Sequence, residues 1–240
     1  MAALKTAAKK ELRRKIQKVL QNIPRESIAS QSALATSRLL SLSEYQNAKR
    51  ISVYLSMPQG EISTTGIVRD ALASGKEVFI PYIHSIEAEP AQPKVSVMDM
   101  LSLNSMEEFE SLTPDKWGIP SLSETSIPTK RNCFGGYGVE PTRPRNPEEA
   151  FGLDLIVMPG VAFDINLRRL GHGKGYYDHF LNRYSREVAG SPGAPQKPFL
   201  VALALKEQVL PPTEEIPVDE HDWLVDTVIV GNGKLIVPEK

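Results

Sequence analysis

The stretch from Arg169 to Asp178 contains the residue types of this chain that are best suited to binding and chemistry. It combines an arginine, a lysine, a histidine, two tyrosines and an aspartate with glycines at the alternate positions Gly171, Gly173 and Gly175. Glycines in this pattern let backbone N–H groups converge on an anion without interference from Cβ atoms, and a helix that begins just after them adds the positive end of its dipole. The stretch therefore predicts a phosphate-binding site.

The two common nucleotide-binding fingerprints do not fit this loop. A G-x-G-x-x-G motif that starts at Gly171 would need glycine in place of Tyr176. A P-loop that ends with Lys174 would need glycine in place of Arg168. A turn that only reverses the chain is the plain alternative, but it does not account for two cations and a carboxylate in the same stretch. The phosphate interpretation is therefore favoured.

The sequence on either side of the loop predicts how it is positioned. Residues 153–158 form a nearly continuous apolar run, which is typical of a strand buried on both faces. After the loop, side chains at the i, i+3, i+4 and i+7 spacing predict an amphipathic helix that starts near Gly175: Tyr177, Phe180, Leu181 and Tyr184. A strand, a loop and a helix in this order place the site at the carboxyl end of a parallel sheet, where open α/β folds bind ligands.

Asp178 falls in the first turn of this helix. A carboxylate close to bound phosphates would be repelled unless a divalent cation lay between them, so a nucleotide in the loop implies Mg²⁺. The alternative is that Asp178 only complements the positive end of the helix dipole. The residues alone do not decide between these two roles.

The rest of the chain alternates between strand and helix patterns. We expect strands at 51–55, 77–83, 199–205 and 225–230, an antiparallel addition at 95–100, and a helix that Thr64 caps and Gly75 ends. This alternation predicts one α/β domain over residues 1–240, with an N-terminal helical region at 1–48. Two stretches rich in Pro, Gly, Ser and Arg, near 124–150 and 185–198, are expected to be surface insertions.

The composition argues against several classes of function. The chain has 240 residues, 41% of them hydrophobic, and its net charge of −1 gives no general attraction to nucleic acid or to anionic membranes. Its one cysteine, Cys133, cannot form an intrachain disulfide or a cysteine-based zinc cluster, which favours a reducing compartment. No apolar stretch approaches the roughly 18 residues needed to cross a bilayer. We therefore expect a soluble, cytoplasmic protein without nucleic-acid or membrane partners.

The N-terminal segment has two interpretations. Its many basic residues, with Glu11 as the single acid, resemble an organelle presequence. However, apolar residues recur at near-helical spacing and continue toward a second helical stretch at 28–40: Leu4, Ala8, Leu12, Ile16 and Val19 or Leu20. We favour a structural helix with a cationic face over a cleaved leader, and a mitochondrial copy of the protein stays possible.

Several motifs occur in the order found in one known family. They are KKELR at 9–13, LSMPQGEI at 55–62, WGIP at 117–120, DLIVMPGVAFD at 154–164, RLGHGKGYYD at 169–178, and ALA at 202–204 with HD at 221–222. Together they resemble the 5-formyltetrahydrofolate cyclo-ligase family, also called 5,10-methenyltetrahydrofolate synthetases. The resemblance covers most of the chain and leaves out the two expected insertions.

The resemblance implies an activity and a fold. The activity is the ATP- and Mg²⁺-dependent cyclisation of 5-formyltetrahydrofolate to 5,10-methenyltetrahydrofolate, with release of ADP and phosphate. Transfer of the γ-phosphoryl group to the formyl oxygen would form an iminium phosphate, which a neighbouring folate nitrogen then attacks. The fold is an open three-layer α/β/α sandwich with a mostly parallel sheet, similar to ribose-phosphate isomerases and CoA-transferases. We expect a monomer with small-molecule partners only.

The resemblance also implies site residues, position by position. The ATP-binding residues are Lys9, Lys10, Glu11, Leu12, Arg13, Arg169, Leu170, Gly171, His172, Gly173, Lys174, Gly175, Tyr176 and Tyr177. The folate-binding residues are Leu55, Met57, Glu61, Trp117, His172, Gly173, Lys174, Gly175 and Tyr176. The metal positions are Asp178 and Asp222. The residues expected to be catalytic are Lys174 and Arg169, which neutralise developing charge, and Tyr176, which hydrogen-bonds the reacting group.

Several of these roles have alternatives. Glu61 suits a pterin because a carboxylate accepts a pair of hydrogen bonds, but it could be a surface glutamate after a turn. Trp117 could stack on a ring or lie in the core, and Tyr176 could be a packed phenol. His172 stands at a variable position of the motif and receives no chemical role. Two other functions remain: a non-catalytic folate or nucleotide binder, and a sugar-phosphate isomerase on the same scaffold, which would need a general base and no ATP.

Overall fold

The computed structural model describes residues 2–86, 95–139, 150–189 and 197–238. The strands of its main sheet are β1 (Arg50–Val53), β2 (Glu77–Ile86), β3 (Val95–Leu103), β6 (Leu155–Met158), β9 (Phe199–Ala204), β10 (Thr227–Val230) and β11 (Leu235–Ile236). Their order in this seven-stranded sheet is β11-β10-β9-β6-β1-β2-β3. The five strands from β10 to β2 pair in parallel, and the two edge strands, β11 and β3, pair antiparallel.

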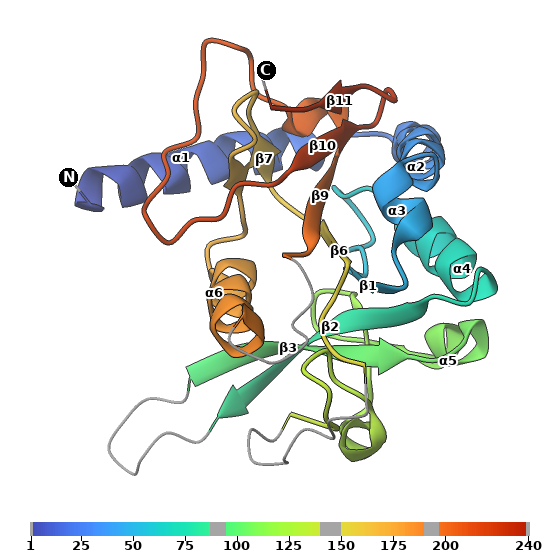
Figure 1. Cartoon of the computed structure of the whole chain (residues 1–240). Helices are drawn as coiled ribbons and strands as arrows, with labels where there is room; N and C mark the ends of the chain where they lie inside the picture. Colours follow the sequence, from blue (N-terminus) through green and yellow to red (C-terminus); the bar gives the residue numbers. More distant parts are fainter. Residues whose placement is uncertain (1, 87–94, 140–149, 190–196, 239–240) are drawn as a thin grey trace.

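Helices cover both faces of this sheet. The α-helices of the described residues are α1 (Ala2–Leu20), α2 (Arg25–Leu40), α3 (Ser43–Asn47), α4 (Thr65–Ala73), α5 (Met106–Ser111) and α6 (Tyr176–Ala189). Short 3₁₀ helices span Glu124–Thr129 and Lys206–Gln208, and two small hairpins pair β4 (Thr113–Pro114) with β5 (Pro120–Ser121) and β7 (Ala162–Phe163) with β8 (Arg169–Leu170). Helices α2, α3 and α4 lie on one side of the sheet and α6 on the other (Figure 1). The expected three-layer α/β fold with a mostly parallel sheet is confirmed.

The apolar patterns explain why the central elements form. β6 is buried along its whole length between β1 and β9, as its continuous apolar run predicted. α6 begins at Tyr176, and its core-facing side chains follow the predicted spacing, with Phe180 and Leu181 each 2% exposed. β3 is the expected antiparallel addition beside β2. These elements could be predicted from the local sequence, because each buries a regularly spaced set of apolar side chains.

The direction in which the chain adds strands reverses at one point of the sheet, between β1 and β6. From β1 the chain continues to β2 on one side, and from β6 it continues to β9 on the other side, although β1 and β6 are neighbours. In open parallel sheets such a reversal leaves a crevice outside the carboxyl ends of the two strands, where ligands bind. The segment that follows β1 leads to residues 55–61, and the segment that follows β6 leads to the glycine-rich stretch. Both candidate binding segments therefore start from the carboxyl ends of neighbouring central strands.

Helix α1 departs from the expected apolar stripe. Ile16 and Leu20 are buried, whereas Leu4 and Val19 are 73% and 44% exposed and Ala8 is also exposed. The helix ends at Leu20 and a short turn separates it from α2, so the two are not continuous. The first half of α1 therefore has few apolar contacts, and its basic side chains contact the protein instead.

The start of α4 differs from the prediction at Thr64. This residue stands at the N-cap position, but its side chain does not cap the helix. Its hydroxyl donates to the carbonyl of Tyr54 at 2.6 Å, and so ties α4 to the segment that follows β1. Gly75 ends the helix as expected, with a φ of +72°.

The stretch near 124–150 is not a surface insertion in its described part. Ile127, Lys130 and Cys133 are buried. Two backbone hydrogen bonds, of 2.8 and 3.1 Å, join residues 131–133 to β3. The composition was misleading because an irregular segment can pair with an edge strand without any regular apolar period. Residues 140–149 lie outside the described residues.

The stretch near 185–198 is also only partly an insertion. Residues 185–189 form the last part of α6, and Val188 is 4% exposed in the core. β9 begins at Phe199, directly after the end of the stretch. Residues 190–196 lie outside the described residues.

We predict that replacement of residues 129–147 by a short Gly-Ser linker strongly destabilises the protein. The change would remove buried Lys130 and Cys133 and leave backbone groups of β3 unpaired, which predicts a fall in the melting temperature of more than about 10 °C. Thermal unfolding followed by circular dichroism measures this change. Replacement of residues 140–149 alone is the matched control, since it retains the buried contacts. An unchanged melting temperature for the longer replacement would restore the surface-insertion interpretation.

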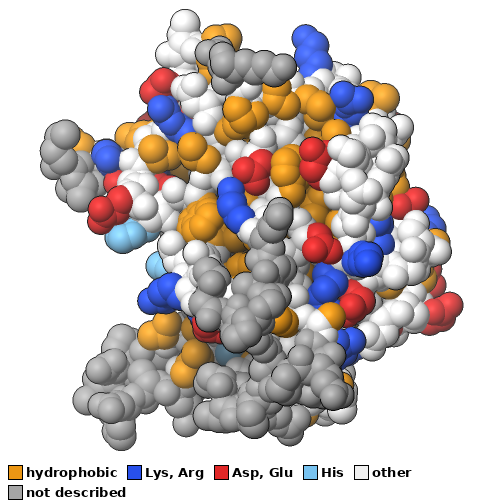
Figure 2. Space-filling view, viewed as in Figure 1, with side chains coloured by type: hydrophobic (Ala, Val, Ile, Leu, Met, Phe, Trp, Pro, Cys, Tyr) orange, Lys and Arg blue, Asp and Glu red, His pale blue; other side chains and the backbone are white. Residues whose placement is uncertain are grey.

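The surface agrees with the absence of a strong charge bias. Basic and acidic side chains are interspersed on the face shown in Figure 2, rather than gathered into one cationic region. Among the described helices, none has the length and apolar character that a membrane crossing requires.

Candidate active site

The glycine loop, residues 171–175, connects the β7–β8 hairpin to α6. Gly173 and Gly175 have φ angles of +101° and +67°, which glycine adopts far more readily than residues with a side chain. At Gly175 a Cβ atom would also lie 3.1 Å from Nε2 of His179. Because α6 starts at Tyr176, the positive end of its dipole adjoins the loop.

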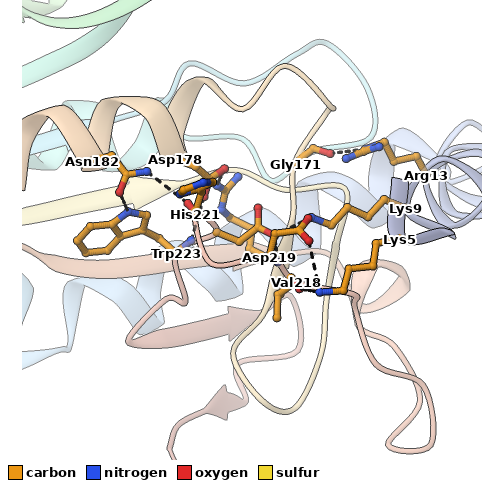
Figure 3. A network of polar contacts seen from close by, with 12 residues as sticks. Lys5, Lys9, Arg13, Gly171, Asp178, Asn182, Val218, Asp219, His221 and Trp223 are labelled. Atoms are coloured by element: carbon orange, nitrogen blue, oxygen red, sulfur yellow. Dashed lines mark hydrogen bonds and ion pairs between the residues drawn. The ribbon is translucent and has the colours of Figure 1, made fainter. Parts of the chain in front are cut away.

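Helix α1 contacts this loop through Arg13. Its Nε donates to the carbonyl oxygen of Gly171 at 2.7 Å (Figure 3). Its guanidinium lies so close to Gly173 that a Cβ there would be 3.4 Å from the arginine Cζ. Burial lowers the pKa of Arg13, and the Asp222 carboxylate opposes this effect. Two segments that the resemblance assigns to one nucleotide are thus in contact although they are far apart in the sequence.

The other candidate residues of α1 divide between its faces. Lys9 is partly buried, and Leu12 packs against the core. Lys10 and Glu11 are exposed, and the Glu11 carboxylate pairs with Arg14 at 2.8 Å. The structure therefore brings Lys9, Leu12 and Arg13 toward the body of the protein, and leaves Lys10 and Glu11 on its surface.

An irregular segment near the C-terminus, residues 211–226, joins α1 to the glycine loop region; we call it the C-terminal strap. Lys9 Nζ lies 2.9 Å from Asp219 Oδ2 and 2.6 Å from Asp222 Oδ2. Lys5 Nζ donates to the carbonyl of Val218 at 2.8 Å (Figure 3). Burial lowers the pKa of Lys9, but its hydrogen bonds to Asp222 and Asp219 outweigh this and raise the pKa above its ordinary value. The acidic strap thus balances part of the cationic face of α1.

Arg169, in β8 before the loop, and Asp178, in the first turn of α6 after it, form an ion pair. Arg169 NH2 lies 2.9 Å from Asp178 Oδ2, and the arginine side chain is only 3% exposed. The second carboxylate oxygen of Asp178 accepts a hydrogen bond of 3.1 Å from the backbone N–H of Trp223 in the strap. Asp178 therefore does more than complement the dipole of α6, because it balances a buried cation and fixes the strap.

The two expected metal positions both contact cationic side chains. Asp178 pairs with Arg169 and Asp222 pairs with Lys9, and their side chains are 18% and 26% exposed. In the described part of the chain, no group of three or more His, Cys, Asp and Glu side chains is arranged to hold a metal ion. A magnesium ion here would therefore depend on ligand oxygens as well, which is its usual behaviour with nucleotides.

Two buried donors near the loop fit an anionic ligand. The Nε of Arg169 and the hydroxyl of Tyr177 have no hydrogen-bond partner within the described residues. The Arg169 guanidinium lies 5.6 Å from the centre of the Tyr177 ring, so the two groups are neighbours. Burial raises the pKa of Tyr177 well above its ordinary range, which keeps the phenol protonated and able to donate. Since unpaired buried donors are costly, phosphate oxygens or water would stabilise them.

Glu61 belongs to the segment that follows β1, and it is buried. It is 7% exposed, so it is not the surface glutamate of the alternative interpretation. Its Oε2 accepts the backbone N–H of Met57 at 2.9 Å, and its Oε1 lies 3.3 Å from Nε2 of His172. Leu55 is also buried, at 6% exposure. The structure therefore brings the segment after β1 into contact with the glycine loop.

Trp117 is not a core tryptophan. It is 55% exposed, and the ammonium of Lys116 lies 4.2 Å from its ring centre. The next residue, Gly118, packs so closely on Pro58 that a Cβ there would lie 2.8 Å from the proline ring. The Trp117 turn therefore lies beside the segment that carries Glu61, which suits a role in stacking on a planar ligand.

The remaining candidates lie on the loop or directly after it. Lys174 is exposed and has no hydrogen bond or ion pair with any residue that the structure describes. Tyr176 is partly buried against the core at the start of α6, and Leu170 is buried within β8. Lys174 is thus a free cation at the loop, whereas Tyr176 has packing contacts as well.

Sequence reasoning missed the residues that connect these parts. Asn182 accepts from Trp223 Nε1 at 3.0 Å and donates to the carbonyl of His221 at 3.4 Å. It stands four residues after Asp178 on α6, so helical spacing could have placed both on one face. Asp219 belongs to the acidic C-terminal region, but no spacing rule connects it to Lys9.

The fold and this site are those of an open α/β protein with a candidate phosphate-binding loop at a topological switch point. The chain belongs to the 5-formyltetrahydrofolate cyclo-ligase family, whose family model matches residues 5–231. This confirms the resemblance that the sequence motifs indicated.

Individual relatives agree with this assignment. The chain is 38% identical over 225 residues to 5-formyltetrahydrofolate cyclo-ligase of Mus musculus, a match that covers 93% of each chain. It is 32% identical over 237 residues to the protein of the same name from Saccharomyces cerevisiae, covering 95% of this chain and 98% of the relative. The NMR structure of Aquifex aeolicus 5,10-methenyltetrahydrofolate synthetase is similar, with a TM-score of 0.60, 27% identity, and coverage of 93% of this chain and 90% of that one.

Proposed function

We propose that this protein catalyses the ATP-dependent cyclisation of 5-formyltetrahydrofolate to 5,10-methenyltetrahydrofolate, with release of ADP and phosphate. The observation that carries the proposal, together with family membership, is that Arg13 contacts the glycine loop and that His172 of the same loop contacts buried Glu61. A nucleotide phosphate site and a carboxylate suited to a pterin would thus be adjacent. The γ-phosphoryl group could then reach the formyl oxygen without leaving the site.

The phosphate side of the reaction would use the glycine loop and its neighbours. Lys174, free of other partners within the described residues, would contact the transferred phosphoryl group. Arg169 would act from β8, directly before the loop. Its buried guanidinium contributes positive charge, and its Nε lacks a partner among the described residues. Positioning and charge neutralisation supply most of the catalysis in phosphoryl transfer. Tyr176, at the end of the loop, would hydrogen-bond the reacting group.

The carboxylates of Asp178 and Asp222 would hold Mg²⁺ together with phosphate oxygens. When bound, the ion would neutralise phosphate charge and fix the geometry of the triphosphate. Both carboxylates retain some exposure, and both are oriented by hydrogen bonds from backbone N–H groups, those of Trp223 and Asp219. These contacts would keep the two side chains in place while the cationic partners rearrange.

The folate side would use the segment after β1 and the Trp117 turn. Glu61 would accept two hydrogen bonds from adjacent ring donors of the pterin. Trp117 would stack on the planar part of the substrate, and Leu55 and Met57 would line the same site. An exposed tryptophan next to a buried carboxylate is the kind of pairing that small-molecule sites use for affinity and orientation.

The assay for this proposal follows the near-ultraviolet absorbance of the methenyl product. Product is expected only when protein, 5-formyltetrahydrofolate, ATP and Mg²⁺ are all present. Chelation of Mg²⁺ and omission of ATP are the two controls. Equal rates with and without ATP would contradict the phosphoryl-transfer mechanism, and a lack of product under all conditions would favour a binding protein.

We predict that Arg13→Ala raises the KM for ATP. The guanidinium contacts the loop at Gly171 and is placed to contact phosphate, so its loss should cost about 1.5–3 kcal/mol of ATP binding, or roughly 10- to 150-fold in KM. Steady-state kinetics with saturating folate measures this change. Arg14→Ala is the matched control, because Arg14 is 67% exposed and pairs only with Glu11 among the described residues. An unchanged KM for ATP in a folded Arg13 variant would mean that the cationic face of α1 is only solvated and does not bind ATP.

We further propose that the protein acts as a monomer in the cytoplasm. The contacts of Lys5, Lys9 and Arg13 make α1 part of the folded site, which favours a structural helix over a cleaved leader. Light scattering of the purified protein tests the monomer, and cell fractionation tests the compartment. Import accompanied by loss of the first 20 residues would contradict both the compartment and the role of α1.

A further inference from the structure

The contact between Glu61 and His172 joins the two halves of the site. Glu61 is 7% exposed, and its only hydrogen bonds within the described residues are the one to its Oε2 from the Met57 N–H and the contact of its Oε1 with His172 Nε2. Within the described residues, no lysine or arginine pairs with this carboxylate, and His172 is its one side-chain partner. The contact links the segment after β1 to the middle of the glycine loop.

The surroundings of Glu61 make a partner for this oxygen necessary. Tyr54 and Tyr177 both lie near the carboxylate and are buried. Burial, and after it the charge of Glu61, raises the pKa of Tyr54, and this phenol donates to the carbonyl of Ile62 at 2.9 Å rather than to Glu61. Arg169 lies over Tyr177 but pairs with Asp178 rather than with Glu61. A buried carboxylate with an unpaired oxygen is costly, so the imidazole stabilises the site.

The same contact is well suited to exchange. The 3.3 Å separation is long for a charge-assisted hydrogen bond, and the His172 side chain is 43% exposed. His172 stands between Gly171 and Gly173, and Gly173 has a φ of +101°. Glycine has more backbone conformations open to it than other residues, so the chain on both sides of His172 can change conformation at low cost. A weak contact on such a loop can be replaced at small cost by a better hydrogen-bond donor.

We propose that His172 is a placeholder for the pterin: it holds Glu61 Oε1 until the folate substrate displaces it, and this displacement transmits folate binding to the glycine loop. The inference rests on the proposed function, because it assumes that the substrate donates to Glu61. While His172 contacts Glu61, the loop is drawn toward the folate side. Once folate takes Oε1, the loop is free to close on the nucleotide, so each ligand favours binding of the other.

The experiment compares His172→Ala with His172→Gln, which retains a side-chain donor. Isothermal titration calorimetry measures 5-formyltetrahydrofolate binding without nucleotide. A second titration measures binding of a non-hydrolysable ATP analogue with Mg²⁺, with and without folate. His179→Ala is the matched control, since His179 is exposed and does not contact Glu61.

The expected results separate a placeholder from an ordinary contact. His172→Ala should bind folate about three- to tenfold more tightly, because a competitor for Oε1 is removed. Its melting temperature without ligands should fall by a few degrees, and folate should raise it more than in the unmodified protein. Folate should tighten analogue binding in the unmodified protein and in His172→Gln, and should have no effect on it in His172→Ala.

Other outcomes overturn the inference. Weaker folate binding by His172→Ala, with coupling retained, would make His172 an ordinary substrate contact. Unchanged folate affinity and unchanged coupling would mean that the contact has no consequence for binding. If the unmodified protein cyclises the substrate and only these results fail, the inference falls and the proposed function stands. If the unmodified protein does not bind 5-formyltetrahydrofolate, both fall.

Discussion

Lys174→Ala is expected to lower kcat by roughly 10²–10³-fold and to change nucleotide affinity by less than about fivefold. Lys174 is the only lysine of the glycine loop, and it is exposed and free of hydrogen bonds or ion pairs with the described residues. An ammonium beside the γ-phosphoryl group stabilises most strongly the charge that shifts during transfer. Its loss should therefore affect the transition state more than ground-state binding.

Single-turnover kinetics and calorimetry with a non-hydrolysable ATP analogue measure the two quantities separately. Because Lys174 makes no contact that supports the described fold, the variant should have an unchanged melting temperature. Lys234→Ala is the control, since Lys234 is exposed in the turn between β10 and β11 and is not one of the candidate site residues. Loss of nucleotide affinity equal to the loss of kcat would make Lys174 a binding residue only, and near-normal kcat would remove it from the mechanism.

Features with local causes could be predicted from the sequence. The apolar run of β6 and the helical spacing of α6 each reflect one buried surface. The glycines at alternate positions reflect positive φ angles, which Gly173 and Gly175 adopt. The fold class and the position of the glycine loop between a strand and a helix follow from these elements. Family motifs added the assignment of α1 to the same site, which no spacing rule supplies.

Features that depend on tertiary contacts could not be predicted. The hydroxyl of Thr64 does not accept a backbone N–H of its own helix but donates to the carbonyl of Tyr54, just after β1, at 2.6 Å. Residues 131–133 pair with β3, although their composition is typical of a loop. The contact of His172 with Glu61 spans 111 positions of sequence. It forms because the glycine loop and the segment after β1 meet at the carboxyl end of the parallel strands. In each case the partner is set by the fold and not by neighbouring residues.

Asp178 shows how such a contact changes the interpretation of one residue. From the sequence it could complement a helix dipole or hold a metal ion, and both roles assume that the carboxylate is otherwise free. The structure instead places Arg169, nine residues earlier, at 2.9 Å from it, with the guanidinium almost completely buried. A variant at this position therefore changes stability as well as any metal site, and the two effects must be measured separately.

We expect Asp178→Asn to lower the free energy of unfolding by about 2–4 kcal/mol, which corresponds to a fall of roughly 5–15 °C in melting temperature. The substitution preserves shape and can still accept the Trp223 N–H, but it leaves a guanidinium that is 3% exposed without its counter-charge. Arg169→Met should be less destabilising, because the carboxylate that remains is 18% exposed and can be hydrated. The double variant should therefore be more stable than Asp178→Asn alone.

The metal role of Asp178 requires a second measurement on the same variants. At a temperature where Asp178→Asn is folded, the dependence of nucleotide affinity on Mg²⁺ concentration should shift to higher Mg²⁺, and excess Mg²⁺ should recover part of the affinity and rate. Arg169→Met keeps the carboxylate, so its Mg²⁺ dependence should shift much less even though its kcat falls. If Asp178→Asn is as stable as the unmodified protein, the ion pair does not support the fold. If its Mg²⁺ dependence is unshifted while stability falls, Asp178 acts only by balancing Arg169, and the ion must be held by Asp222 and the phosphates.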